Sequence, residues 1–213
     1  MINRITSFSL AFLLVFPITA VQAGSVQDTN ELIETLDLTQ SLQGSFVQEQ
    51  YGSDGVLQGT SSGTFKMLRP GYFSWEISSP DSQLILVTPQ YLWHLDRDLQ
   101  TLTRRPVSDS NAMSPLQLLG GKENLLNSGF DVTKTSDNLF SITQKKNKSA
   151  TNAGFSSLSV SLDKNVIAAM EIIDGLNQRM VITFQEVDKL GVLTQLDFDF
   201  TAPDGVDLFY YDE

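Results

Sequence analysis

The sequence predicts a mainly β protein with a small α content: a strongly curved antiparallel sheet, or half-barrel, closed by short helices that act as a lid over a hydrophobic cavity. Three observations predict this fold. Apolar and polar residues alternate with a period of two through most of the chain. Turn signals rich in Gly, Pro and Asp separate the alternating segments at regular spacing. Two segments have helical spacing instead, and the concave side of a twisted sheet is the simplest place to bury their apolar faces.

The first 23 residues have the pattern of a secretory signal peptide. Arg4 supplies the positive charge, an apolar stretch extends to Ile18, and Val21-Gln22-Ala23 provides a small-x-small cleavage site, so cleavage is expected after Ala23. A transmembrane anchor is the alternative, but the apolar stretch is shorter than the roughly 18 residues that a spanning helix needs. We expect residues 24–213 to form a single exported domain, located in the periplasm if the source is a bacterium.

The first expected element is a helix at residues 28–39, with Leu32, Ile33 and Leu36 on one face. An Asp-Thr pair provides its N-cap. Period-two segments follow, and we expect strands at residues 44–51, 59–69, 72–78, 83–88, 91–96, 130–135, 139–144, 155–162, 168–174, 180–187 and 196–201.

A second helical segment is predicted at residues 110–127, between the two groups of strands. Pro115 suits the first turn of a helix and Gly120-Gly121 suits its end. With the first helix, this insert would form the lid.

Composition excludes several classes of function. The chain has no Cys and one His, which excludes thiol catalysis, disulfide frameworks and clustered Cys or His metal sites. A net charge of −11 argues against a protein that binds nucleic acid or anionic lipid headgroups. We therefore expect no cofactor, no metal and no nucleic acid partner.

Five patterns, in order along the chain, carry a family resemblance. They are residues 42–48 (LQGSFVQ), 63–75 (GTFKMLRPGYFSW), 86–93 (LVTPQYLW), 114–119 (SPLQLL) and 198–207 (FDFTAPDGVD). Together with the signal peptide, this ordered set resembles the LolA family of periplasmic outer-membrane lipoprotein carriers. The third pattern differs from the family in its turn, Thr88-Pro89-Gln90-Tyr91, which lacks Asp-Gly and is one residue shorter.

The resemblance implies a periplasmic chaperone that shields lipoprotein acyl chains in a hydrophobic cavity. It implies three kinds of partner: lipoproteins, an ATP-dependent transporter of the inner membrane that releases them, and a lipoprotein receptor of the outer membrane. It also implies a monomer with no catalytic residues.

Arg69 is the candidate lid latch. Phe65, Met67 and Arg69 share one face of their predicted strand, so a guanidinium follows two apolar side chains into the same side. A charge there is costly unless it is hydrogen-bonded, and Arg offers five donors to acceptors such as the C-terminal carbonyls of a lid helix. The alternative is an Arg at a strand end that reaches solvent beside Pro70. The resemblance implies that Arg69 holds the lid closed in the empty state.

Apolar side chains on the same strands and on the predicted lid are candidates for the cavity wall. For any single one of them, an ordinary place in the sheet core is the alternative. The set comprises Phe46, Phe65, Met67, Phe73, Trp75, Ile77, Leu84, Leu86, Leu92, Met113, Leu116 and Leu119.

Two other functions compete with lipoprotein carriage. A hydrolase would use paired carboxylates, and the candidates are Asp96 with Asp98 or Asp197 with Asp199, although a solvated strand face also explains them. A lipid-sensing or glycolipid-binding protein of the same fold is the second alternative, because fold alone does not decide the ligand.

Overall fold

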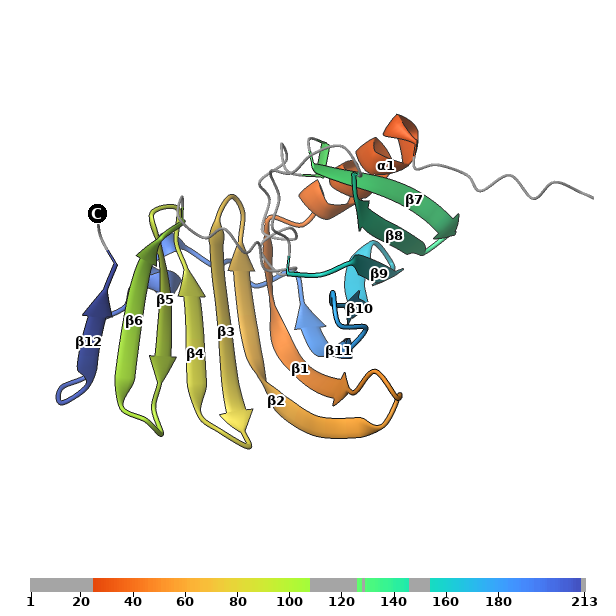
Figure 1. Cartoon of the computed structure of the whole chain (residues 1–213). Helices are drawn as coiled ribbons and strands as arrows, with labels where there is room; N and C mark the ends of the chain where they lie inside the picture. Colours follow the sequence, from red (N-terminus) through yellow and green to blue (C-terminus); the bar gives the residue numbers. More distant parts are fainter. Residues whose placement is uncertain (1–24, 108–125, 128, 146–153, 212–213) are drawn as a thin grey trace, which may run out of the picture.

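A computed structural model describes residues 25–107, 126–127, 129–145 and 154–211. These residues include the 12-residue helix α1, a short 3-10 helix and a single 12-stranded sheet (Figure 1). The elements are α1 (Val26–Asp37), β1 (Ser41–Tyr51), β2 (Leu57–Leu68), β3 (Tyr72–Ser79), β4 (Gln83–Val87), β5 (Tyr91–Asp96), β6 (Thr101–Pro106), β7 (Phe130–Ser136), β8 (Leu139–Gln144), β9 (Ser157–Asp163), β10 (Val166–Ile173), β11 (Arg179–Asp188), η2 (Gln195–Phe198) and β12 (Asp207–Tyr210).

Two antiparallel meanders make up the sheet, whose strand order is β12-β6-β5-β4-β3-β2-β1-β11-β10-β9-β8-β7. The first meander contains β1 to β6 and the second contains β7 to β11. They join where β1 pairs with β11, with Phe46 opposite Phe184. After β11 the chain returns to the far edge, where β12 pairs with β6 in parallel. This parallel pair at the edge adds to the antiparallel sheet that the sequence predicts.

The sheet curls strongly, so that β7 and β8 stand across from the first meander, and α1 lies beside β7 (Figure 1). Helix α1 begins where the Ser25 side chain accepts a hydrogen bond from the Asp28 N–H at 2.9 Å. Its Leu32 and Leu36 side chains are buried. The prediction of a mainly β, strongly curved sheet is confirmed.

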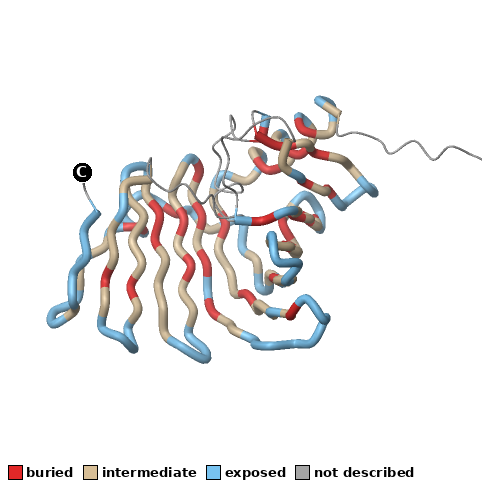
Figure 2. The backbone as a smooth tube through the Cα atoms, viewed as in Figure 1, coloured by how far each residue is buried: buried red, intermediate tan, exposed pale blue. Residues whose placement is uncertain are grey.

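One continuous apolar cluster fills the concave side under α1. It runs from Leu32 of the helix through Phe140 and Val160 of the second meander to Phe46 and Trp75 of the first. Burial is concentrated toward the helix end of the strands, whereas many of the hairpins at the opposite end are exposed (Figure 2). The helix therefore covers only part of the concave face.

A smaller cluster lies on the convex face. Leu193 and Phe198, from the segment that links β11 to β12, pack there against Leu86. Residues 196–201 were expected to form a strand because Leu196, Phe198 and Phe200 alternate, and this expectation is wrong. The structure has the short helix η2 instead, with Phe198 buried and Leu196 exposed.

Two strands were not expected. Strand β6 contains two arginines and ends at a proline, and β12 has only four residues, so neither carries a clear apolar alternation. The signal peptide and nearly all of the predicted insert at 110–127 lie outside the described residues.

The short turn between β4 and β5 leaves the register of the hairpin regular. The Thr88 N–H donates to the Tyr91 carbonyl at 2.9 Å, and the Tyr91 N–H donates to Thr88 Oγ1 at 3.1 Å. Val87 then faces Leu92 across the hairpin. The Thr88 hydroxyl thus closes a turn that lacks Asp-Gly.

Removal of a core aromatic side chain from the second meander should destabilise the protein strongly. Phe140 is 1% exposed, so Phe140→Ala is expected to lower the free energy of unfolding by about 3–5 kcal/mol. Thr143→Ala, at an exposed position of the same strand, should change it by no more than about 0.5 kcal/mol. Urea denaturation followed by tryptophan fluorescence measures both. Equal effects would contradict the assignment of faces in β8.

Candidate functional site

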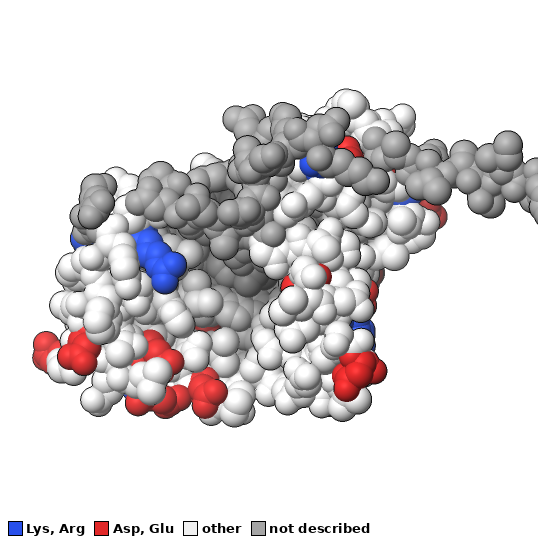
Figure 3. Space-filling view, in the orientation of Figure 1, with Lys and Arg blue, Asp and Glu red and all other residues white. Residues whose placement is uncertain are grey.

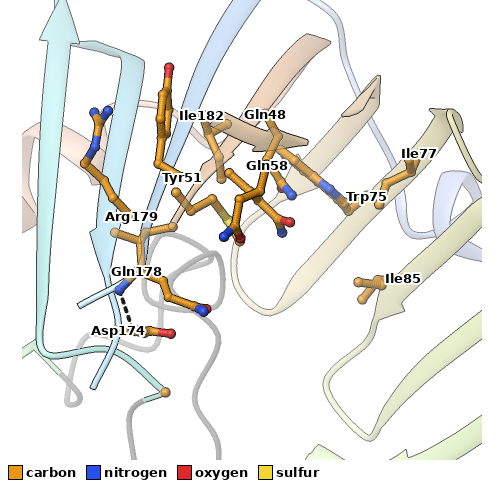
Figure 4. Close-up of a pocket in the computed structure, with 14 residues that line it drawn as sticks. Gln48, Tyr51, Gln58, Trp75, Ile77, Ile85, Asp174, Gln178, Arg179 and Ile182 are labelled. Atoms are coloured by element: carbon orange, nitrogen blue, oxygen red, sulfur yellow. Dashed lines mark hydrogen bonds between the residues drawn. The ribbon is translucent and has the colours of Figure 1, made fainter. Parts of the chain in front are cut away.

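An open groove of about 430 Å³ lies on the concave face, where α1 does not cover it. It appears in Figure 3 as a hollow whose walls are mostly uncharged, and Asp174 and Arg179 are the charged residues that line it. The side chains around it are drawn in Figure 4. Its lining residues are Gln48, Gln50, Tyr51, Gln58, Trp75, Ile77, Ile85, Gly154, Ile172, Asp174, Gln178, Arg179, Met180 and Ile182.

Strand alternation directs these side chains to one face. On β3 and β4, Trp75 stands opposite Ile85. On β1 and β11, Gln48 stands opposite Ile182, and Gln50 stands opposite Met180. Residues two apart on a strand point the same way, so both meanders contribute to one surface. The groove therefore spans the junction between β1 and β11.

A cluster of aromatic rings forms the inner end of the groove. The rings of Phe46 and Trp75 stack with centroids 3.5 Å apart, and Phe73 lies 6.0 Å from Trp75. Phe184 packs edge-on against Phe65 at 5.0 Å. Stacked and edge-to-face rings fix one another's orientation. The inner wall is therefore apolar and tightly packed.

Most of the predicted cavity residues lie on the concave side. Trp75 and Ile77 line the groove itself. The others on this side belong to the aromatic cluster or pack against the same core: Phe46, Phe65, Met67, Phe73 and Leu92. Met113, Leu116 and Leu119 lie outside the described residues.

The structure corrects the placement of Leu84 and Leu86. Both lie on the convex face, where they pack in the cluster with Leu193. Their neighbours Ile85 and Val87 take the concave positions opposite Trp75 and Phe73. The strand is apolar at four consecutive positions, so its alternation does not reveal which two face the cavity.

Arg69 lies where α1 meets both arms of the sheet. Its side chain is 5% exposed, and its Nη1 donates to Asp37 Oδ1 at 3.1 Å. Leu36, Met67 and Ile167 surround the same place, which leaves a gap of only about 10 Å³. The predicted partner was the backbone of a lid helix, whereas this structure adds a carboxylate from the last residue of α1. A buried guanidinium is stabilised by such a partner, and removal of the partner leaves an uncompensated charge.

The other end of α1 is attached to β7. The Lys134 N–H donates to Asp28 Oδ2 at 2.9 Å, and Lys134 Nζ donates to Glu31 Oε1 at 2.6 Å. The hydrogen bond from the Lys134 backbone, with a second from Ser25, lowers the pKa of Asp28. The hydrogen bond to Glu31 raises the pKa of Lys134. Polar contacts to Arg69, directly after β2, and to β7 therefore hold the helix at both ends.

In each carboxylate pair that would serve a hydrolase, one member accepts hydrogen bonds within a turn. Asp96 Oδ1 accepts the N–H groups of Asp98 and Leu99 at 3.1 and 2.9 Å. Asp197 Oδ2 accepts the N–H of Thr194 at 2.7 Å, which lowers its pKa. These carboxylates stabilise local backbone conformation. Among the described residues, no cluster of three or more His, Cys, Asp or Glu could hold a metal ion, and no helix is long and apolar enough to cross a membrane.

Sequence reasoning missed the residues from the second meander and the polar outer wall. Ile172, Met180 and Ile182 face the groove from β10 and β11. Arg179 stacks over the Tyr51 ring at 4.0 Å beside the opening. Gln48 shares the phase of Phe46 on β1, and this phase was the signal that could have identified it. The positions of the other residues depend on the pairing of β1 with β11, which the sequence pattern does not reveal.

The chain matches the family described as "Outer membrane lipoprotein carrier protein LolA" over residues 37–201. A protein of Cupriavidus necator named "Outer-membrane lipoprotein carrier protein" is 31% identical over 213 residues, which cover 97% of this chain and 98% of that one. A protein of the same name from Bordetella avium is 28% identical over 97% of this chain and 96% of its own length.

Solved structures share the fold at low sequence identity. A putative outer membrane lipoprotein-sorting protein domain from Vibrio parahaemolyticus superposes with a TM-score of 0.52 at 11% identity, covering 81% of this chain and 95% of that one. An uncharacterized conserved protein from Thermus thermophilus gives a TM-score of 0.51 at 11% identity, covering 86% and 98% of the two chains. These likenesses concern the fold.

The attachment of α1 to β7 predicts a loss of stability in acid. Because the folded-state pKa of Asp28 is lowered, its stabilising effect is complete above the unfolded pKa of about 3.9 and is lost as the pH falls through the folded value. Asp28→Asn should lower the urea midpoint at neutral pH and reduce its dependence on pH below about pH 5. The exposed Asp81→Asn should leave the midpoint and its acid dependence close to wild type. An unchanged acid limb in Asp28→Asn would show that this contact contributes nothing.

Proposed function

Since the chain belongs to the LolA family of outer-membrane lipoprotein carrier proteins, we propose that it accepts lipoproteins released from the inner membrane and delivers them to a receptor in the outer membrane. The chain is a lipoprotein carrier and not an enzyme. Carriers of this family work in the periplasm, and cleavage of the signal peptide after Ala23 would leave the mature protein there.

The observation that carries the proposal is the apolar groove of about 430 Å³ on the concave face. Ile77, Ile85 and Met180 are half-buried and offer an apolar surface open to solvent on one side, the kind of surface that receives acyl chains. Contact between water and a contiguous apolar surface is unfavourable. Such an exposed surface on a folded protein therefore marks a binding site.

The free energy of acyl-chain burial is so large that the empty carrier must oppose the binding of cargo. Each buried methylene contributes about 0.8 kcal/mol, so three chains of about 14 methylenes would contribute about 30 kcal/mol if fully buried. The free energy of non-covalent binding reaches at most about 20 kcal/mol, and a carrier that bound this tightly would not release its cargo. Incomplete burial, or a closed empty state that must be opened, lowers the affinity to a useful range.

The Arg69–Asp37 ion pair supports a closed empty state that must be opened before cargo binds. It connects the end of α1 to β2, beside the aromatic cluster. Movement of α1 away from the sheet would break the pair and expose Leu32 and Leu36 to water. Loading then needs energy from an ATP-dependent transporter, and release to a receptor that binds more tightly proceeds downhill.

The proposal is tested by lipoprotein release from spheroplasts. Mature protein is added to cells that contain newly made outer-membrane lipoproteins, and the supernatant is assayed for soluble one-to-one complexes. Energy-dependent release is expected, with ATP depletion as the control. If no lipoprotein is released but the protein binds other lipids, the chain is instead a lipid-binding protein of the same fold.

Loss of the Arg69–Asp37 ion pair should leave the loading of lipoprotein intact and impair its delivery. Arg69→Leu is expected to load lipoprotein at least as readily as wild type and to transfer it to outer membranes about tenfold less efficiently, because the closed empty state no longer drives release. Arg97→Leu is the matched control, since it removes an exposed Arg–Glu76 pair at 2.8 Å. Poor loading by Arg69→Leu, in a variant that still folds, would contradict the latch.

A charge placed in the groove should abolish binding. Met180 lines the groove, whereas its neighbour Val181 points to the convex face. Met180→Glu is expected to lose both the lipoprotein complex and a fluorescent fatty acid, because a buried carboxylate without a partner is strongly unfavourable. Val181→Glu should retain both. Equal loss in the two variants would place the acyl chains elsewhere.

A further inference from the structure

We infer that the groove binds its cargo in one orientation, with the acyl tails toward the aromatic cluster and with the polar linkage and first peptide residues of the lipoprotein among the glutamines at the hairpin end. This inference rests on the proposed function. It adds a polar subsite and an exit for the polypeptide, both defined by residues of this chain.

The polarity of β1 changes along its concave face. Leu42 and Phe46 are buried, and the next two positions on the same face are Gln48 and Gln50. Leu42 and Phe46 lie about 14 Å apart along the strand, and Gln50 lies about 14 Å further on. A purely apolar ligand would leave the amide groups of the two glutamines without hydrogen bonds, which is unfavourable.

Neighbouring strands change in the same direction. On β2, Met67 and Phe65 give way to Gly63 and then to Ser61, which stands opposite Gln48. On the concave face of β11, the positions from Phe184 back to Met180 are apolar. Polar residues begin only in the hairpin that precedes this strand. The outer end of the groove is therefore bordered by amides on one side and by methyl groups on the other.

The opening of the groove gathers further polar groups from two hairpins. Gln58 follows the β1–β2 turn, while Gln178 and Asp174 belong to the β10–β11 turn (Figure 4). The Asp174 carboxylate is held in place, since its Oδ1 accepts the Gln178 N–H at 2.8 Å. The amides of Gln48, Gln50, Gln58 and Gln178 line part of this end of the groove and offer both donors and acceptors.

These donors and acceptors match the junction of a lipoprotein. Where acyl chains meet the polypeptide, ester and amide carbonyls need donors and peptide N–H groups need acceptors. An amide side chain supplies both without a net charge. Acidic side chains also gather along the hairpin end of the molecule (Figure 3), and Asp54 and Asp81 are exposed there. Hydrated carboxylates make this end a poor location for acyl tails.

Disulfide trapping tests the orientation, and the chain suits it because it contains no native Cys. Gln50→Cys and Gln178→Cys place a thiol at the polar end. Gln90→Cys places one in the exposed turn after β4, at the other end of the strands. Each variant is loaded with a lipoprotein that carries a single Cys a few residues after its acylated N-terminus.

Disulfide yield at Gln50→Cys and Gln178→Cys is expected to exceed that at Gln90→Cys by about tenfold, because the effective concentration of the two thiols falls with their separation. The yield should also fall as the lipoprotein Cys is moved further from the N-terminus. A one-to-one complex that cross-links as well or better at Gln90→Cys would overturn the orientation and leave the proposed function intact. Absence of any complex with wild-type protein would overturn both.

A second set of variants tests the amides themselves. Gln48→Leu combined with Gln50→Leu removes the hydrogen bonds of these side chains, so the complex that the double variant forms should lose the preference for cross-linking at Gln178→Cys over Gln90→Cys. Gln185→Leu, exposed on β11, is the matched control and should keep the preference. Retention of the preference in the double variant would show that the amides do not orient the cargo.

Discussion

The buried guanidinium of Arg69 is the contact that attaches the end of α1 to the sheet. It lies between α1, β2 and the turn that leads into β10, so it connects the helix to both arms of the sheet. A charge in such a place is tolerated because Asp37 approaches it at 3.1 Å. Movement of the helix separates the two charges, whereas movement of an apolar contact would only expose surface. The ion pair therefore gives the end of α1 a definite position on the sheet.

The open groove follows from the proportions of the sheet. A sheet of 12 strands has a concave face larger than one 12-residue helix can cover. The second meander and α1 fill their own side with a continuous core, and the remaining surface between Trp75 and Ile182 stays open. A globular protein would normally fill such a hollow with side chains. Here the aromatic cluster stops at the inner end, and the described residues leave the groove unfilled.

Much of the fold could be predicted from the sequence, because period-two alternation is a local property. Arg69 could be identified because a charge in the apolar phase of a strand demands a partner. The inward face of β4 could not be assigned, since Leu84 to Val87 are all apolar and only pairing with β3 sets their phase. Residues 196–201 alternate like a strand, but the Thr194–Asp197 hydrogen bonds stabilise a helical turn instead. The wall contributed by β10 and β11 depends on long-range pairing, which no local pattern encodes.

The junction between β1 and β11 determines when the binding surface comes into existence. Each meander pairs strands that are neighbours in sequence, but Ser45 meets Gln185 across 140 residues. Pairing over this distance is entropically costly and comes late in folding compared with hairpins. Because the groove has one wall on each meander, neither half offers a surface for acyl chains before they join. Competence to hold cargo is therefore a property of the finished chain, and a ligand lying across the junction favours the joined state by mass action.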